Sequence, residues 1–222
     1  MTIEQVLTYG TRILIIFLVL PLHEFAHAWS AKKLGDNTAQ YMGRLTLNPL
    51  MHVDPLGALL LLFTGFGWAK PVPVNPLRFK KYRLGMALTA AAGPLSNLIV
   101  AFAAMITYRA LVYVQNMRDF MTYENFSYVY MIAQFFILIN IGLAVFNMIP
   151  IPPLDGSKVL SYFLPADFER RLEQNQMIVT LVFFGLIFTG VLSKPIGIVT
   201  DLVWSGMIFL TGWVDSIMRI IL

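Results

Sequence analysis

The chain has 222 residues, of which 58% are hydrophobic and 13% are charged, whereas soluble domains carry about 25% charged residues. This composition excludes an ordinary soluble protein, and several apolar runs reach the roughly 20 residues that a helix needs to cross a bilayer. The lack of cysteine excludes disulfides, thiolate nucleophiles and cysteine metal ligands. The net charge of +4 does not indicate a nucleic-acid partner, because Lys and Arg of membrane proteins gather on cytoplasmic loops.

The first part of the chain predicts one membrane helix followed by an irregular region. Residues 6–33 form an apolar segment that ends in two lysines. In the region after it, residues 41–47 alternate at the period of a strand, and residues 68–74 contain prolines suited only to an edge strand. Residues 56–66 are apolar but too short to span, which predicts a re-entrant or interfacial segment. We therefore expect a small β-hairpin and a re-entrant piece here.

The remaining segments predict an all-α polytopic membrane protein with about five transmembrane helices. The second runs over about residues 84–114, and the third over 126–149, where prolines exclude a continuing helix. The fourth and fifth follow at about 176–192 and 196–221. We expect one domain over residues 1–222, with a core at about 6–160 and C-terminal helices at about 174–221.

The positive charges predict the orientation of the chain. Eight Lys and Arg residues lie between Lys32 and Arg83, and Lys158, Arg170 and Arg171 lie in a second interval two crossings later. Both intervals therefore share one side, which the positive-inside rule makes cytoplasmic. This predicts a multi-pass protein of the cell membrane with its N-terminus outside and the end of the first helix near the cytoplasmic face.

The stretch His23-Glu24-Phe25-Ala26-His27 places three polar side chains in an apolar helix. Histidines four residues apart project from one helix face, where both rings can bind one Zn²⁺. Glu24, beside the first ligand, can then serve as general base for a zinc-bound water. Metal coordination offsets the cost of burying such groups in a bilayer, so we favour a zinc site over a chance match.

A catalytic zinc site needs a third protein ligand. His52 is one candidate, and Asp155 is another, because it follows a proline-broken helix end and precedes Gly156. Asp155 can equally be read as the N-cap of a helix that starts at Ser157.

The complete pattern resembles the site-2 protease family of intramembrane zinc metalloproteases. The resemblance is carried by HEFAH and by Asn147-Met148-Ile149-Pro150-Ile151-Pro152-Pro153-Leu154-Asp155-Gly156, and similar segments extend it over about residues 10–160. It implies a core of three helices and one Zn²⁺ per chain, held by His23, His27 and Asp155, with Glu24 as base. It also implies that Asn147 positions substrate or stabilises the oxyanion. The activity expected is hydrolysis of peptide bonds within or near transmembrane segments of membrane proteins, as in regulated intramembrane proteolysis.

Weaker expectations concern the surroundings of the site. His52 is a second oxyanion donor, a gate residue or a structural residue of a turn, and Asn97 binds substrate, braces the site or bonds across helices. Arg44, Leu45 and Thr46 lie in the predicted edge strand, where an unwound transmembrane substrate can pair as an added strand.

Two other classes of function remain open for the sequence. One is a transporter or a membrane-segment-binding protein on the same scaffold, because polar residues and broken helices within the membrane also suit transporters. The other is a metal-storage or metal-sensing protein, which needs the three ligands but not Glu24.

Overall fold

The computed structural model describes residues 3–65, 67–118, 120–165, 170–172 and 174–221. Four helical stretches of the described residues are long and apolar enough to cross a membrane: Thr8–Lys33, Tyr82–Arg118, Tyr123–Asn147 and Ser193–Ile221. The fourth predicted span, at about residues 176–192, corresponds to α9 (Gln176–Phe188), whose 13 residues extend only about 20 Å. This is less than the roughly 30 Å of a bilayer's hydrocarbon core, so five crossings are not confirmed.

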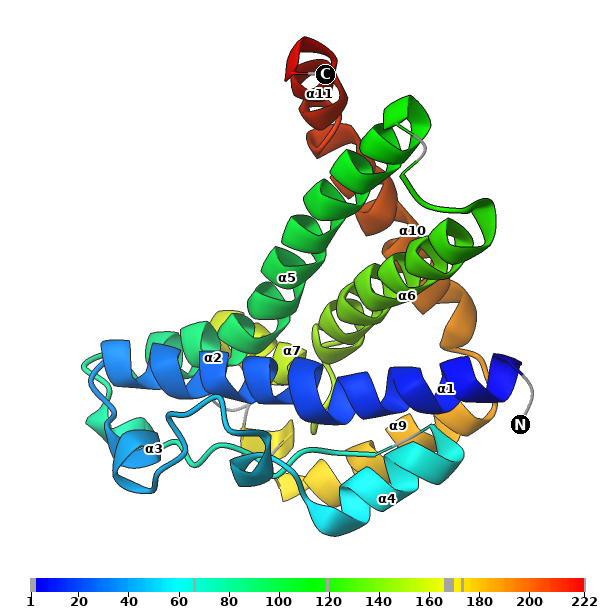
Figure 1. Ribbon diagram of the computed structural model, residues 1–222. Helices are drawn as coiled ribbons and strands as arrows, with labels where there is room; N and C mark the ends of the chain where they lie inside the picture. The colour runs from blue at the N-terminus through cyan, green and yellow to red at the C-terminus, as the bar shows by residue number, and fades with distance from the viewer. Residues whose placement is uncertain (1–2, 66, 119, 166–169, 173, 222) are drawn as a thin grey trace.

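The first span is a continuous rod made of three pieces (Figure 1). Its pieces are α1 (Ile3–Leu14), the π-helical turn η1 (Ile15–Val19) and α2 (Leu20–Lys33). Pro21 stands just after the π-helical turn, and a proline ring inside an α-helix clashes with the carbonyl four residues earlier. Widening of the helix over residues 15–19 accommodates this ring, directly before the two histidines.

Helix α5 joins the histidine end of this rod to the other spanning helices. Helix α5 (Tyr82–Arg118) packs against α2, and α6 (Tyr123–Asn147) packs along α5. Helix α7 (Asp155–Phe163) returns to the start of α5. The fourth span, α10 (Ser193–Leu210) followed by α11 (Trp213–Ile221), contacts α6 with its first part and α5 with its second. The bidentate pair of Arg109 with Asp215 fastens α11 to α5.

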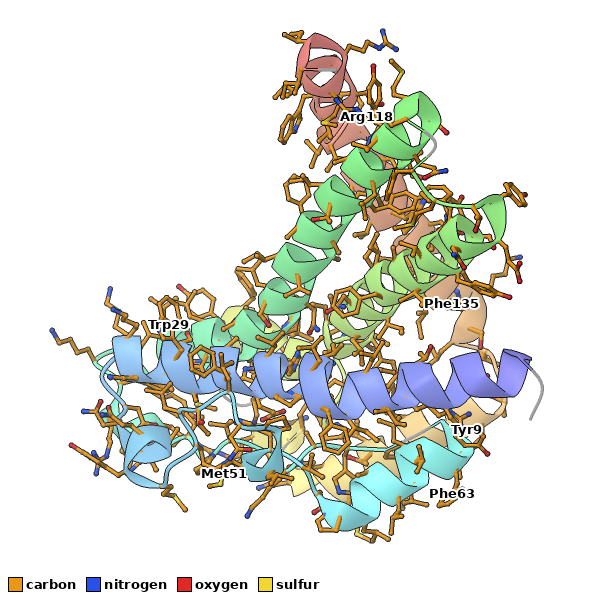
Figure 2. All side chains as sticks on the ribbon, in the orientation of Figure 1. Tyr9, Trp29, Met51, Phe63, Arg118 and Phe135 are labelled. Carbon is orange, nitrogen blue, oxygen red and sulfur yellow. The ribbon has the colours of Figure 1, made fainter. Side chains whose placement is uncertain are left out.

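Large apolar side chains cover the outside of the spans, as contact with lipid requires. Trp29 on α2, Phe135 on α6 and Phe63 on α4 (Pro55–Thr64) are all exposed, and Figure 2 shows Phe63 pointing away from the rod. The tightly packed centre lies between α5, α6 and α10, around Ala101, Met105 and Ile137. The chain is therefore apolar both inside and outside, in agreement with a membrane-embedded protein.

The predicted β-hairpin at residues 41–47 is not confirmed. The segment follows the short helix α3 (Thr38–Tyr41), and Gly43 takes a left-handed φ of +68°, which ends any extended run. Within the described ranges the structure contains no β-strand, and Val53 and Ala69 form an isolated antiparallel bridge. The two predicted extended pieces are joined by a side chain instead, because the buried Arg44 guanidinium donates to the carbonyls of Lys70 and Pro71.

Helix α4 is a short apolar helix at the position of the predicted re-entrant segment. It begins after the Asp54 cap, where the carboxylate accepts from the Gly57 N–H, and it lies alongside α1 (Figure 1). Carbonyls in the last turn of a helix lack helical partners, and within a bilayer water cannot replace them. Arg12 supplies a donor, since its Nη1 lies 2.6 Å from the Leu62 carbonyl oxygen. Arg12 thus caps α4 from the first span.

We expect Arg12→Met to loosen the end of α4. Loss of a charged hydrogen bond to a partly buried carbonyl costs about 1–3 kcal/mol. Amide hydrogen exchange of residues 61–65 should therefore accelerate, and the melting temperature in detergent should fall. Arg118→Met is the matched control, because Arg118 is exposed at the end of α5. Equal exchange in both variants would contradict the capping role.

A carboxylate outside the spans fastens the irregular region to the end of α2. Asp36 is fully buried, and its two oxygens accept from the backbone N–H groups of Thr38 and Asn75. Burial alone would raise the pKa of this carboxyl. The hydrogen bonds from Thr38 and Asn75, together with the Arg78 charge, outweigh burial and lower the pKa below its ordinary value.

The lowered pKa of Asp36 predicts a pH dependence of stability. Because the folded-state pKa lies below the unfolded one, the stabilisation is complete above about pH 4 and is lost as pH falls through the folded-state value. Asp36→Asn should lower the free energy of unfolding at pH 7 and flatten its fall in acid, measured by denaturation in detergent. A variant with the same acid profile as the wild type would contradict this assignment.

Candidate active site

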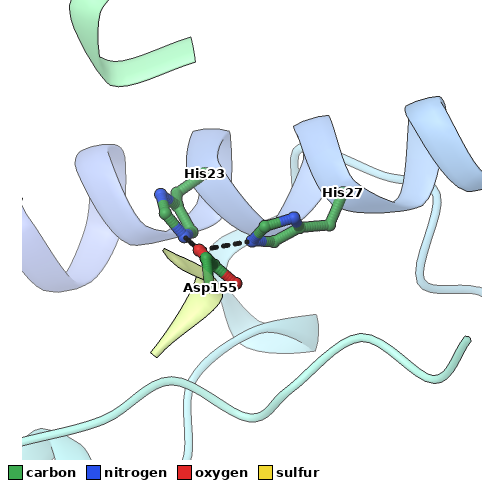
Figure 3. A group of neighbouring side chains, drawn as sticks. All are labelled: His23, His27 and Asp155. Atoms are coloured by element: carbon green, nitrogen blue, oxygen red, sulfur yellow. Dashed lines mark hydrogen bonds and ion pairs between the residues drawn. The ribbon is translucent and has the colours of Figure 1, made fainter. Parts of the chain in front are cut away.

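The two histidines of α2 meet Asp155 at the point where α2, α5 and α7 converge. Nε2 of His23 and Nε2 of His27 lie 3.2 and 3.3 Å from Oδ2 of Asp155, and Figure 3 shows both rings turned toward this carboxylate. One ligand atom from each residue lies within 4.8 Å of the others. Residues 132 positions apart in the chain thus share one site.

The spacing of these atoms fits a tetrahedral metal ion. Two ligands held about 2.0–2.1 Å from a tetrahedral Zn²⁺ lie about 3.3 Å apart, close to the two distances from the Asp155 oxygen. Two imidazoles and one carboxylate also form a ligand set found in catalytic zinc sites with an open position. His23, His27 and Asp155 are therefore the residues that would hold the zinc.

Each imidazole is oriented by a hydrogen bond on its other nitrogen. Nδ1 of His27 lies 2.7 Å from the Thr89 carbonyl oxygen, and Nδ1 of His23 lies 2.6 Å from Oδ1 of Asn97. Both partners are on α5. With Nδ1 protonated for these bonds, the Nε2 lone pairs point into the site, as metal ligands require.

Two glycines allow this close convergence. A Cβ on Gly93 of α5 would lie 2.4 Å from Nε2 of His27 and 2.6 Å from Cε1 of His23. A Cβ on Gly156 would lie 2.3 Å from the Met148 carbonyl oxygen, at the end of α6. The first glycine lets the α5 backbone approach the rings, and the second lets α7 begin beside α6. Asp155 is the first residue of α7 rather than its N-cap, which is Leu154.

Glu24 faces the same cavity from the next position along α2. Its Oε2 accepts a hydrogen bond of 3.1 Å from the Val72 N–H, so residues 70–75, here called the strap, lie over the glutamate. The cavity of about 160 Å³ has room for about five water molecules at about 30 Å³ each. Its lining consists of Glu24, His27, Pro71, Val72, Val74, Met86, Thr89, Ala90, Asp155 and Lys158.

The weaker expectations fare differently. The side chain of Asn147 donates to the Leu143 carbonyl of its own helix, and it is not among the residues that line the cavity. His52 is fully buried and its Nε2 lies 2.8 Å from the Thr46 carbonyl oxygen, an arrangement that favours the structural reading. Neither residue belongs to the cluster of metal-ligating groups.

The predicted substrate-binding residues are engaged in the protein itself. Arg44 is buried against the strap, and Leu45 and Thr46 follow it in a bend rather than in an edge strand. Asn97 is 1% exposed and contacts His23, which is the bracing geometry rather than a substrate-facing one.

The sequence reading named Asn97 as a possible brace but missed the groups that orient His27 and the base. The Thr89 carbonyl and the Val72 N–H are backbone atoms, which no side-chain pattern reveals. Asn140, by contrast, gave a usable signal, because an amide inside an apolar spanning helix predicts a polar partner across helices.

We expect Gly93→Ala to weaken metal binding. The added methyl group collides with both imidazoles, and overpacking of this kind costs about 1–3 kcal/mol, or about 5- to 150-fold in zinc affinity. Gly142→Ala on α6 is the control, since a Cβ there meets nothing within 4 Å. Zinc affinity measured by competition with a chelator should fall only in the first variant, and equal affinities would contradict the close approach of α5.

The comparisons with known proteins agree with this site. The sequence model of Peptidase family M50 matches residues 11–191. The chain is 40% identical over 181 residues to "Putative zinc metalloprotease YwhC" of Bacillus subtilis, covering 79% of this chain and 80% of that protein. It is 27% identical over 202 residues to "Putative zinc metalloprotease Rip2" of Mycolicibacterium smegmatis, covering 87% and 73%.

A third relative is "Putative zinc metalloprotease MJ0611" of Methanocaldococcus jannaschii, 32% identical over 143 residues, which are 63% of each chain. No solved structure matches the chain. The family match covers most of the chain and includes both halves of the metal site. The chain therefore belongs to Peptidase family M50, the site-2 protease family of zinc metalloproteases.

Proposed function

We propose that this protein is an intramembrane zinc endopeptidase that hydrolyses a peptide bond within or near a transmembrane segment of a membrane-protein substrate. The observation that carries the proposal is the joint presence of His23, His27 and Asp155 around one point, with Glu24 facing the same cavity. Family membership supports a metalloprotease. The placement of the histidines in a spanning helix supports a substrate met within the membrane.

The metal supplies part of the chemistry. Zn²⁺ bound by two histidines and a carboxylate lowers the pKa of a coordinated water to about 7 and polarises a substrate carbonyl. The remaining work falls to side chains of this protein.

Glu24 is suited to moving the proton. The Val72 N–H holds its Oε2, so the carboxylate is fixed while its other oxygen can accept a proton from the attacking water. The protonated Glu24 then returns this proton to the departing amide nitrogen, and the peptide bond breaks. Asn147 stabilises the oxyanion if its amide exchanges the Leu143 carbonyl for the substrate oxygen.

The positive side chains support an orientation for this chemistry. With four spans, the interval between Lys32 and Arg83 and the interval after α6 again lie on one side, and both are rich in Lys and Arg. We place that side in the cytoplasm and the N-terminus outside the cell membrane. The metal site, near the end of the first span, then lies close to the cytoplasmic face.

The geometry favours a protease over the other two classes of function. A metal-storage protein or a membrane-segment-binding protein has no use for a carboxylate held beside the ligands by a backbone N–H. A transporter needs a pathway through the membrane, whereas the cavity at the site holds only about 160 Å³. Glu24 is thus the residue that separates the classes.

We expect Glu24→Gln to retain zinc and to lose about 10²- to 10⁴-fold in turnover, the usual contribution of a general base. Turnover is measured as cleavage of a model transmembrane segment in detergent or liposomes, alongside the zinc content of the same preparations. Glu124→Gln, at an exposed position on α6, is the control. Near-normal cleavage by Glu24→Gln would contradict the mechanism.

The ligand role of Asp155 is tested in the same assay. Asp155→Ala removes one of three protein ligands, so both the zinc content and the cleavage should fall. A variant that keeps one zinc per chain would exclude Asp155 as a ligand.

A further inference from the structure

A line of three side chains runs from the metal site into the centre of the membrane-embedded core. Oδ1 of Asn97 lies 2.6 Å from Nδ1 of His23, and Nδ2 of Asn97 donates to Oδ1 of Asn140 at 3.1 Å. Nδ2 of Asn140 in turn donates to the Phe136 carbonyl oxygen at 2.8 Å. Asn97 and Asn140 are each 1% exposed, so water does not compete for these bonds.

The far end of this line determines the direction of every bond in it. A backbone carbonyl can only accept, so the group that Asn140 turns toward Phe136 must be its NH₂. The oxygen of Asn140 then faces Asn97, so Asn97 must donate a hydrogen bond to it from its own NH₂. The oxygen of Asn97 is left for His23, and an oxygen there requires a proton on Nδ1 of the ring.

The consequence reaches the metal-facing nitrogen. A neutral imidazole with its proton on Nδ1 carries a lone pair on Nε2, and Nε2 of His23 is the atom that faces Asp155. If Asn97 were reversed, its NH₂ would face the ring and favour the other tautomer, whose Nε2–H cannot bind a metal. His27 needs no such relay, because the Thr89 carbonyl holds its Nδ1 directly.

We propose that Asn140 is a positioning residue of the metal site, which acts through Asn97 to hold His23 in the tautomer that presents an Nε2 lone pair. The proposal rests on His23 being a zinc ligand, as in the proposed function. Asn140 lies on α6 and has no role in the ligand motif, so it adds a third spanning helix to the control of the metal. Outer partners of metal-bound histidines typically change metal affinity by 10- to 100-fold.

The first test is the zinc affinity of the purified full chain in detergent, measured by competition with a chelator. Asn140→Leu keeps the branched shape of the side chain but removes the acceptor for Asn97, so zinc affinity should fall by about 10- to 100-fold. Gln134→Leu is the matched control, since it also removes an amide from α6, one bonded to Tyr130 rather than to the relay. An unchanged affinity in Asn140→Leu would overturn the proposal.

A rescue variant separates orientation from packing. A carboxylate at position 97 can only accept from His23, whichever way it turns, and no longer needs Asn140 to orient it. Asn97→Asp combined with Asn140→Leu should therefore regain most of the lost affinity. If the double variant binds zinc as weakly as Asn140→Leu alone, Asn140 acts by packing and the proposal is wrong.

A spectroscopic measurement on the wild type does not depend on any substitution at position 97 or 140. In the zinc-free protein, the ¹⁵N chemical shifts of His23, assigned with His23→Ala, should report a proton on Nδ1. A neutral ring with its proton on Nε2 and none on Nδ1 would overturn the relay. If the wild type binds no zinc through His23, the proposed function fails. If the wild type binds zinc normally and the Asn140 variant binds it equally well, only the relay fails.

Discussion

The structure depends on one convergence: two imidazoles from the first span and one carboxylate from the start of α7 meet around a single point in a protein that is otherwise apolar. Polar groups at such depth are expensive unless they are paired or bind a metal. Their neighbours are therefore strongly constrained. At Gly93 and Gly156 the surrounding atoms leave no room for a side chain. The π-helical turn accommodates the proline ring of Pro21, just before the two histidine ligands.

The same requirement governs the irregular part of the chain. Backbone groups that lie beside a membrane span without a regular partner must find one in the protein, and arginines supply donors twice. Arg12 bonds the end of α4, and the buried Arg44 bonds two carbonyls of the strap. A region that looked like sheet edges is thus held by side-chain donors. Its position over Glu24 follows from these anchors and from the Val72 N–H.

The sequence was most informative where polar side chains stand close together in an apolar segment, because burying them there costs free energy. HEFAH within an apolar helix predicts a metal site because few other arrangements tolerate those side chains there, and the proline-broken helix end drew attention to Asp155. The alternation of apolar and polar residues over 41–47 was misleading. Arg44 is buried because it donates hydrogen bonds to the strap, and Gly43 turns the chain. Short periodic patterns do not distinguish a strand from a turn whose side chains alternate for other reasons.

Long-range partners were harder to predict than the ligands. Asn97 was a candidate for bracing, but its two neighbours come from different spans, and one sequence does not reveal which helices pack together. The fourth predicted span is not confirmed, for a simpler reason. An apolar run of sufficient length was visible at residues 176–192, yet the helix ends at Phe188 and Gly190 takes a left-handed φ of +73°, so the regular part is too short.

The size of the cavity limits how a substrate can reach the proposed protease. A helix with its side chains is about 10–12 Å across, whereas the space beside Glu24 holds about 160 Å³ and the strap closes it on one side. An intact transmembrane helix therefore does not fit beside the metal site. A helical peptide bond also has its carbonyl tied to an amide four residues later, so local unwinding meets both demands at once. In the proposed mechanism, unwinding frees the scissile carbonyl and narrows the substrate to a single extended chain.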